Sequence, residues 1–356
     1  MRQPKVLVLI SHITEFRLDN YSIIPNALRR ADCEVIVGDI ETLGYDRGRF
    51  VCRCATITDA CRQGEAFPAE ALRVQAIDHV DLVWSLASPH PATYLETFQL
   101  LWALHQQAPF VNSPEAVLFL NNKITLISSI PTDHLPETVI FNDYETLRQT
   151  VEQERDDSWV LKPPNEGCGA GVYLLNGKIP NTRALIQDAT GNTVANYERY
   201  GRQTIGLSKS YAVLQRYVPN VTENEKRVLI AGGEPICGFR RFHHELDHRA
   251  NVTLGNQFEG LSLTTEESSF CRTLGARLMD MGLMYVGLDL AFPYVLELNL
   301  VNPGALNYSY KATGVDKSGD VIRSIFAALK RRGLLSDVSA ESTSNDALAE
   351  ASSLSP

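Results

Sequence analysis

The sequence predicts an α/β protein in which a parallel α/β domain precedes an α+β region, and three observations support this prediction. Short apolar runs alternate with helical patterns through about residue 112, as in a parallel sheet covered by helices. A glycine-rich segment, GCGAG, follows closely after a strand pattern at residues 158–162. Residues 285–303, YVGLDLAFPYVLELNLVNP, have the pattern of a β-hairpin, because two apolar segments flank the breaker Pro293.

The first domain is predicted over residues 1–112. Apolar runs typical of short buried strands occur at residues 6–10, 34–37 and 81–85. Helical patterns lie between the strand patterns, for example at residues 23–30 and 94–106. Ser113 then begins a helix, because a serine N-cap, Pro114 at the first helical position and an acidic first turn favour a helix start. This helix is expected to run through Leu120 towards Asn122.

Two further units and a tail are predicted for the rest of the chain. Residues 113–210 are expected to form a central subdomain, with elements at residues 135–140, 144–155 and 158–162. Within it, residues 176–210 are polar and rich in Gly and Asn, which predicts a mobile loop with some helix. Residues 211–335 are expected to form a C-terminal subdomain, with strands at 211–217 and Lys226–Ala231 and helices at 266–281 and 321–332. Residues 336–356 have no apolar face and are expected to be disordered.

The composition argues against several classes of function. The 356 residues include 33 Lys+Arg and 42 Asp+Glu, and the net charge of −9 argues against general binding to nucleic acid or anionic membranes. The first apolar run is too short for a signal peptide or a membrane span, and no later segment is long enough. Seven cysteines without an export signal are typical of reduced thiols, and Cys52, Cys54 and Cys61 lack the spacing of a zinc site. We therefore expect a cytoplasmic protein without nucleic-acid or membrane partners.

The predicted hairpin places three oxygen ligands on one face. If its turn is centred on Pro293, Asp289 lies opposite Glu297 and Gly287 lies opposite Asn299. Two carboxylates inside apolar strands are costly unless a cation neutralises them, and Mg²⁺ prefers such ligands. A hairpin with one polar, solvent-facing side is the alternative, and the pattern alone leaves both interpretations open.

Cationic residues occur in two segments that suit an anion. Lys162 precedes PPNEGCGAG, where small residues let backbone N–H groups approach a phosphate, although the segment has neither Walker A nor Rossmann spacing. Arg227 lies within an apolar strand, and Arg240 and Arg241 follow on the partner strand after a Gly-Gly turn. Arginine suits bidentate recognition of carboxylate or phosphate, and a surface salt-bridge ladder is the alternative. The histidines at residues 243, 244 and 248 are interpreted as solvent-exposed loop residues.

Five sequence blocks occur in a fixed order along residues 110–303. They are FVNSPEAVLFLNNK, WVLKPPNEGCGAGVY, LQRYVP, EKRVLIAGGEPI and YVGLDLAFPYVLELNLVNP. In these blocks and in their order the chain resembles the ATP-grasp ligases, in particular bacterial-type glutathione synthetases. The resemblance implies an ATP-grasp fold, with residues 1–112 as the N-terminal parallel α/β domain that precedes it.

The resemblance also implies roles for the residues that match family motifs. The residues implied to bind ATP are Lys123, Lys162, Gly167, Gly169, Gln215, Arg216, Tyr217, Val218 and Glu225. The lysines would contact the phosphates, residues 215–218 would meet adenine largely through the backbone, and Glu225 would hold the ribose. The implied metal ligands are Asp289, Glu297 and Asn299, for one or two Mg²⁺ ions or for Mn²⁺. Arg227 and Arg241 would hold the transferred phosphate and the acceptor carboxylate, and the residues implied to contact substrate are Arg249, Asn251 and Asn302.

The implied activity is ADP-forming ligation of a carboxylate to an amine through an acyl phosphate. It would form a peptide or γ-glutamyl amide bond, with small amino acids or dipeptides as substrates. Four departures from the family pattern line or flank the acceptor pocket. They are the residues that replace a glycine-rich lid at 242–246, Glu166 in the phosphate loop, residues 302–305 in place of a Ser-Pro substrate loop, and a longer segment at 176–210. A glutathione synthetase proper, joining γ-glutamylcysteine to glycine, is one alternative. A non-catalytic ATP-binding protein on the same fold is another. Relatives of this kind often form dimers or tetramers, which leaves a homodimer or homotetramer open.

Overall fold

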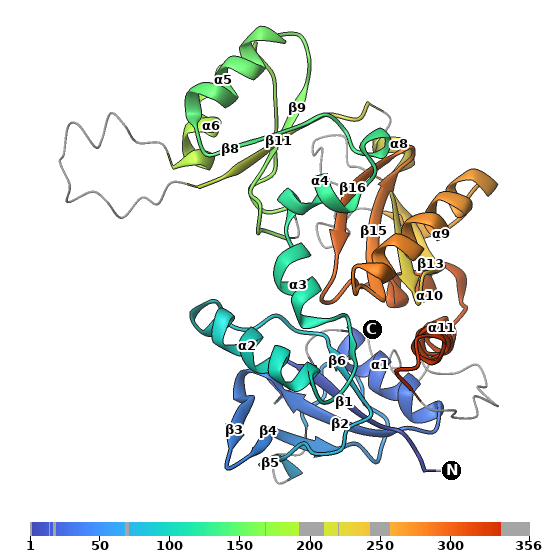
Figure 1. Ribbon diagram of the computed structural model, residues 1–356. Coiled ribbons are helices and arrows are strands. Elements are labelled where there is room, and N and C mark those ends of the chain that lie inside the picture. The colour runs from blue at the N-terminus through green and yellow to red at the C-terminus, as the bar shows by residue number, and fades with distance from the viewer. Residues whose placement is uncertain are drawn as a thin grey trace, which may run out of the picture.

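The computed structural model describes residues 2–13, 15–16, 19–67, 71–167, 169–191, 210–219, 221–242 and 257–335. Three sheets lie one after another along the molecule (Figure 1), with the five-stranded sheet between the seven-stranded and four-stranded sheets. The predicted tail at residues 336–356 falls outside the described residues. Within the part of the chain that is described, every helix is too short or too polar to cross a membrane.

The seven-stranded sheet contains the first part of the chain. Its strands are β1 (Lys5–Ile10), β2 (Glu34–Asp39), β3 (Gly44–Asp46), β4 (Arg49–Thr56), β5 (Arg73–Ala76), β6 (Leu82–Ser85) and β7 (Phe110–Val111). The order is β3-β4-β2-β1-β6-β7, and β5 pairs with β4. The predicted parallel pairing holds for β2, β1, β6 and β7. The sequence did not predict β3, β4 and β5, which form an antiparallel extension of the sheet. Each of these strands is short or only half apolar, so none of them has the continuous apolar run that predicts a buried strand.

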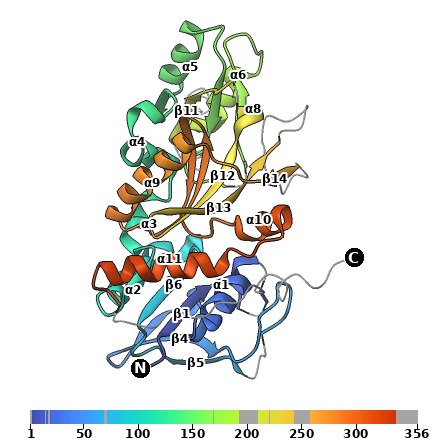
Figure 2. The same cartoon turned by 90° about the vertical axis from the view of Figure 1, so that its right-hand side faces the viewer.

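Two helices cover this first sheet, and a third helix, from the end of the chain, packs on the first of them. Helix α1 (Asp19–Arg30) begins four residues before the predicted start and buries an apolar face that includes Ile23, Ile24 and Leu28. Helix α2 (Tyr94–His105) ends within one residue of the predicted boundary. The last helix, α11 (Ser318–Arg331), packs against α1 although it belongs to the end of the chain. Figure 2 shows α11 lying between the first sheet and the five-stranded sheet.

The four-stranded antiparallel sheet is formed by the central part of the chain. Its order is β10-β9-β11-β8, with β8 (Thr138–Phe141), β9 (Trp159–Lys162), β10 (Tyr173–Leu175) and β11 (Ala212–Arg216). Helices α5 (Tyr144–Gln153) and α6 (Thr182–Thr190) pack on it around a core that contains Leu147, Trp159 and Ile186. Helix α6 and β10 lie near or within the predicted loop region at 176–210, and residues 192–209 are outside the described part.

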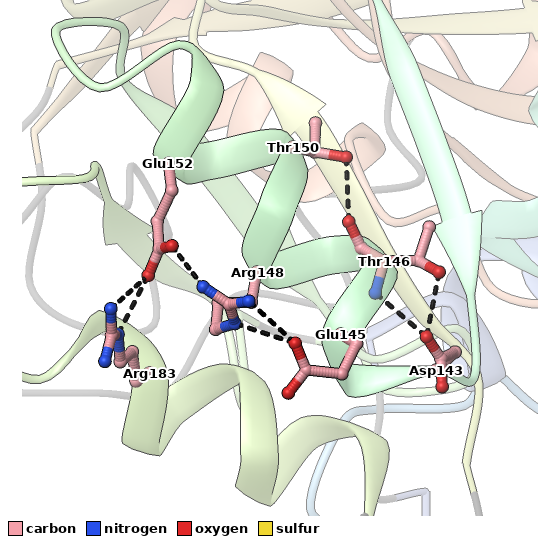
Figure 3. A network of polar contacts seen from close by, with 7 residues as sticks. All are labelled: Asp143, Glu145, Thr146, Arg148, Thr150, Glu152 and Arg183. Carbon is pink, nitrogen blue, oxygen red and sulfur yellow. Dashed lines mark hydrogen bonds and ion pairs between the residues drawn. The ribbon is translucent and has the colours of Figure 1, made fainter.

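A polar network joins α5 to α6 (Figure 3). Asp143 caps α5 by accepting hydrogen bonds from the Thr146 N–H at 2.9 Å and the Thr146 hydroxyl at 2.8 Å. Arg148 forms ion pairs with Glu145 and Glu152 along the helix, and Glu152 also pairs with Arg183 of α6 at 2.7 Å. The pair of Glu152 with Arg183 links the two helices, although an exposed ion pair contributes little by itself.

The five-stranded antiparallel sheet carries the predicted hairpin. Its order is β14-β13-β12-β15-β16, with β12 (Lys226–Ala231), β13 (Glu234–Arg241), β14 (Phe258–Gly260), β15 (Tyr285–Ala291) and β16 (Tyr294–Asn299). Helix α9 (Thr265–Asp280) begins with a capping box formed by Thr264 and Glu267, and it packs on one face. Helix α11 packs on the other. The remaining short helices are α3 (Pro114–Leu120), α4 (Leu126–Ser129), α8 (Val221–Asn224) and α10 (Leu306–Thr313).

One buried side chain joins the first sheet to the hairpin. Asn112, directly after β7, is 4 % exposed. Its Oδ1 accepts hydrogen bonds from the backbone N–H groups of Met284 at 2.6 Å and Tyr285 at 2.8 Å. Its Nδ2 donates to the carbonyls of Tyr285 at 2.8 Å and Leu300 at 2.6 Å. Asn112 therefore satisfies four backbone groups at the base of the hairpin.

Candidate functional site

The hairpin of β15 and β16 places the predicted metal ligands on one face. Asp289 lies opposite Glu297, and Gly287 lies opposite Asn299, which are the pairs that the sequence predicts. Only Phe292 and Pro293 separate the two strands. A register shift after Asp289 restores the expected pairing.

Two arginines from neighbouring strands meet at Asp289, which is 4 % exposed. Arg227 of β12 binds both carboxylate oxygens, with Nη2 at 2.8 Å from Oδ2. Arg241 at the end of β13 places Nη2 at 3.4 Å from Oδ1. Burial opposes ionisation of Asp289, but the two guanidinium groups outweigh burial and hold the pKa of Asp289 below its usual value. The carboxylate is therefore charged, and the predicted catalytic arginines lie beside it.

Both predicted lysines lie near this face. The Lys123 ammonium is 3.1 Å from Glu297 Oε1 and also donates to the backbone carbonyl of Glu166. Lys162, at the end of β9, donates from Nζ to Gln215 Oε1 at 2.8 Å. Burial lowers the pKa of Lys162, and the attraction of Glu297 and other carboxylates offsets this only in part.

A cavity of about 160 Å³ opens between the phosphate loop and the hairpin. The predicted site residues that line it are Lys123, Gly167, Glu297, Asn299 and Asn302. Glu166, which stands where the family pattern has a glycine, lines it as well. Gly169 has φ +73°, in the left-handed region that glycine adopts readily. The loop after β9 and the hairpin thus face one polar space.

Glu225 and Arg241 form a buried pair next to the hairpin. Arg241 Nη1 donates to Glu225 Oε1 at 2.6 Å, and neither residue is more than 8 % exposed. Burial favours loss of the guanidinium charge, but attraction to Asp289 and Glu225 prevails and raises the pKa of Arg241. Arg241 therefore connects Glu225, the predicted ribose-binding residue, with Asp289, a predicted metal ligand.

The predicted adenine hinge at residues 215–218 joins the four-stranded sheet to the hairpin. Gln215 is buried and bonds Lys162, while Val218 packs against Ala291. The backbone N–H of Tyr217 donates to the Ser158 carbonyl at 2.9 Å.

The Arg216 side chain has a structural environment that the family resemblance does not reveal. It forms ion pairs with Glu137 at 2.7 Å, Asp157 at 2.6 Å and Glu154, and its guanidinium lies 4.1 Å from the centre of the Trp159 ring. These contacts hold β11 against its neighbours. Any nucleotide contact by this residue is therefore left to its backbone.

Sequence reasoning missed one residue next to the site. Asn20 of α1 donates from Nδ2 to Oδ1 of Asn302, the predicted substrate residue, at 2.6 Å. An isolated Asn inside an amphipathic helix gives no periodic signal, so only the fold reveals the contact. The predicted substrate residues Arg249 and Asn251 lie outside the described residues, as do the three loop histidines.

The donor set on the hairpin fits a hard divalent ion. Carboxylate and amide oxygens are the ligands that Mg²⁺ prefers. A carboxylate offers about four lone-pair positions, so the two hydrogen bonds from Arg227 and the ion pair with Arg241 still leave Asp289 a position for a metal. The Glu297 side chain is 32 % exposed, and Asn299 donates only its Nδ2, to the Gly287 carbonyl at 3.4 Å. Over the described ranges, no cluster of three His, Cys, Asp or Glu residues offers a competing site.

Comparison with known proteins assigns the chain to a family. Residues 122–313, more than half of the chain, match the family model of the prokaryotic glutathione synthetase ATP-grasp domain. The chain belongs to this family. Among its relatives, the glutathione synthetase of Agrobacterium fabrum is 28 % identical over 228 residues, which cover 64 % of this chain and 66 % of the relative. That of Nostoc is 25 % identical over 250 residues, covering 70 % and 71 %. The match thus spans about two thirds of these family members.

Solved structures show the same fold. The ATP-grasp ligase PsnB, complexed with a minimal precursor, Mg and ADP, aligns with a TM-score of 0.57 and 18 % identity over 92 % of this chain and 98 % of PsnB. The D-cycloserine synthetase DcsG aligns with a TM-score of 0.59 and 14 % identity over 92 % and 99 %. The macrocyclase MdnC, bound with precursor peptide MdnA, gives 0.60 and 12 % over 91 % and 99 %. The predicted ATP-grasp fold and membership of an ATP-grasp ligase family are confirmed.

Proposed function

We propose that this protein is an ATP-dependent, ADP-forming ligase that joins a carboxylate to an amine. One observation carries the proposal: four cationic side chains and the two hairpin carboxylates converge on the same side of β12, β15 and β16. The cations are Lys123, Lys162, Arg227 and Arg241. Phosphoryl transfer needs this arrangement, because charge on the transferred group must be balanced by cations already in place.

The hairpin would hold Mg²⁺ through Asp289, Glu297 and Asn299. When bound, the metal would neutralise negative charge on the nucleotide phosphates. Lys123 lines this cavity, and the buried Lys162 lies close enough to Glu297 to be attracted by its charge, so both would contact phosphate oxygens. The hinge at residues 215–218 would receive the adenine, and Glu225 would lie near the ribose.

The chemistry would proceed in two steps. A carboxylate is a poor electrophile, and transfer of the γ-phosphoryl group of ATP to its oxygen would give an acyl phosphate and ADP. Arg227 and Arg241 would hold the acyl phosphate and stabilise the oxyanion that forms when the amine attacks. The amine nitrogen would form the new C–N bond, inorganic phosphate would leave, and the nitrogen would release its proton. This sequence requires no nucleophile from the protein.

The substrates are proposed to be small amino acids or dipeptides. Relatives that are named glutathione synthetases support γ-glutamylcysteine and glycine as the first pair to test. The neighbours PsnB and MdnC are bound with precursor peptides, which supports peptide acids as a second class. Asn302 lines the cavity, so it would contact the acid substrate. We propose a cytoplasmic location, consistent with the reduced-thiol composition.

ADP release tests the proposal. Purified protein with Mg²⁺ and ATP would receive γ-glutamylcysteine plus glycine, then a panel of free amino-acid pairs that includes glutamate, then peptide acids with amino acids. We expect ADP release that depends on both acid and amine. An Arg227→Met variant is the matched control, because it keeps the length of the side chain and removes its charge. Absence of turnover with every pair, while ATP still binds, would reject the ligase and favour a non-catalytic ATP-binding protein.

A further inference from the structure

The first sheet region contacts the candidate site through a buried side chain to which the proposed reaction gives no role. Asn20 lies in the first turn of α1 and is completely buried. Its Nδ2 donates to Asn302 Oδ1 at 2.6 Å and lies 3.5 Å from the Tyr285 hydroxyl. The contact joins residues 282 positions apart. It connects α1 to the loop that follows the metal hairpin.

The loop that begins with Asn302 is held in one conformation. Arg227, which binds Asp289, also donates from Nη1 to the Pro303 carbonyl at 2.6 Å. Gly304 and Ala305 follow with φ +65° and φ +76°. A positive φ is unfavourable for alanine and persists only where surrounding contacts impose it, and Ala305 is 1 % exposed. The Asn302 backbone is therefore fixed, and the remaining freedom lies in its side-chain amide.

The contact with Asn20 decides which end of that amide faces the cavity. A primary amide is planar, with an acceptor oxygen and a donor nitrogen at its two ends. Because Oδ1 of Asn302 is turned to Asn20, its Nδ2 is turned away. Asn302 lines the cavity, and within the described ranges its Nδ2 has no hydrogen-bond partner. The amide thus offers a donor to whatever occupies the cavity.

We propose that Asn20 is a positioning residue that orients the Asn302 amide so that Nδ2 donates to an oxygen of the acid substrate. The inference rests on the proposed function, because it assigns the acid substrate to this cavity. It restricts the group at this point to a hydrogen-bond acceptor, such as a second carboxylate or an amide carbonyl. An ammonium group at this point would face Nδ2, which is a donor and cannot accept a hydrogen bond from it.

The burial of Asn20 argues for function over stability. Its own Oδ1 is buried, and the described residues offer it no hydrogen-bond partner. A buried acceptor without a partner lowers stability, so the side chain is a poor choice for packing alone. Asn26, on the same helix, is also buried but uses both ends of its amide, on the Cys61 carbonyl at 2.7 Å and the Cys61 N–H at 2.8 Å. Asn26 is therefore a matched structural control.

A double-mutant cycle tests the inference. The variants are Asn20→Ala, Asn302→Ala, the double variant and Asn26→Ala, each assayed by ADP release with the acid–amine pair that the wild type uses. We expect Asn20→Ala to raise the KM of the acid about tenfold, because the Asn302 amide is no longer held with Nδ2 toward the acid and the hydrogen bond between them is weakened. The KM of ATP and the melting temperature should change little. Because Asn20 acts through Asn302, the double variant should match Asn302→Ala alone.

The outcomes separate the inference from the proposed function. Unchanged KM of the acid in Asn20→Ala, or additive effects in the double variant, would overturn the inference while the wild-type activity still supports the ligase. A rise in the KM of the acid in Asn26→Ala equal to that in Asn20→Ala would show a general effect of helix α1 and would also overturn it. A wild-type protein without turnover would reject the proposed function, and the inference would fall with it.

Discussion

Replacing Asn112 with alanine should destabilise the protein more than the same replacement of the buried Asn26. The substitution removes four hydrogen bonds and leaves two N–H groups and two carbonyls of the hairpin base unpaired. At about 1 kcal/mol for each bond, the free energy of unfolding should fall by about 4 kcal/mol. Asn26→Ala removes two bonds to Cys61 and should cost about 2 kcal/mol.

Urea unfolding without nucleotide, at one protein concentration and followed by tryptophan fluorescence, measures both variants. Trp84 is a suitable probe, since its ring packs edge-on against Tyr285 at 5.2 Å. Asn112→Asp keeps the two acceptor bonds but places a carboxylate beside two carbonyl oxygens, so it should also be destabilised. If Asn112→Ala lost less free energy than Asn26→Ala, the reasoning from the four bonds would be refuted.

Three further predictions concern the candidate site. Glu297→Gln should reduce ADP release at least about 100-fold, because a metal ligand is lost. The free energy of unfolding should change by less than about 1 kcal/mol, because the ion pair of Glu297 with Lys123 is partly exposed. Activity like that of the wild type would exclude the metal assignment. Arg216→Ala should lower stability by about 2 kcal/mol through the lost ion pairs and the Trp159 contact, and an altered KM for ATP would contradict this structural role. Burial lowers the pKa of Lys162, so the unfolded chain binds more protons, and wild-type stability should rise with pH from that lowered pKa up to its ordinary value of 10.5. Lys162→Met should lack this contribution, and parallel pH–stability curves for the two proteins would refute it.

The hairpin could be predicted because its information is local. Alternation in two adjacent apolar segments sets which residues share a face, so the pairing of Asp289 with Glu297 follows from the sequence. The register shift that produces this pairing could not be predicted, because bulges depend on packing against β12. The antiparallel strand β4, RFVCRCAT, was missed because its polar residues interrupt the apolar run.

Residues that act across long sequence distances were accessible only through the fold. Asn20 and Asn302 meet because α1 packs against α10 and α11, next to the loop that follows the hairpin, and nothing in either local sequence encodes that contact. Arg216 matched a family motif, yet the sequence does not show that three acids from two other segments surround its side chain. Strands β3 and β5 of the first sheet were not predicted for a related reason, because short strands are stabilised mainly by pairing with neighbouring strands and carry little signal of their own.

The contact of Arg227 and Arg241 with Asp289 bears on the order in which ligands would arrive. In the protein alone, the arginines already neutralise the buried carboxylates around the hairpin, so no carboxylate there is left buried without a counter-charge. A free divalent ion would find its carboxylate shielded by two guanidinium groups and would bind weakly. A nucleotide offers those arginines and lysines phosphate oxygens instead, which would release lone pairs of Asp289 for coordination. Metal and nucleotide would therefore bind as one unit, and a titration with Mg²⁺ alone should give little heat.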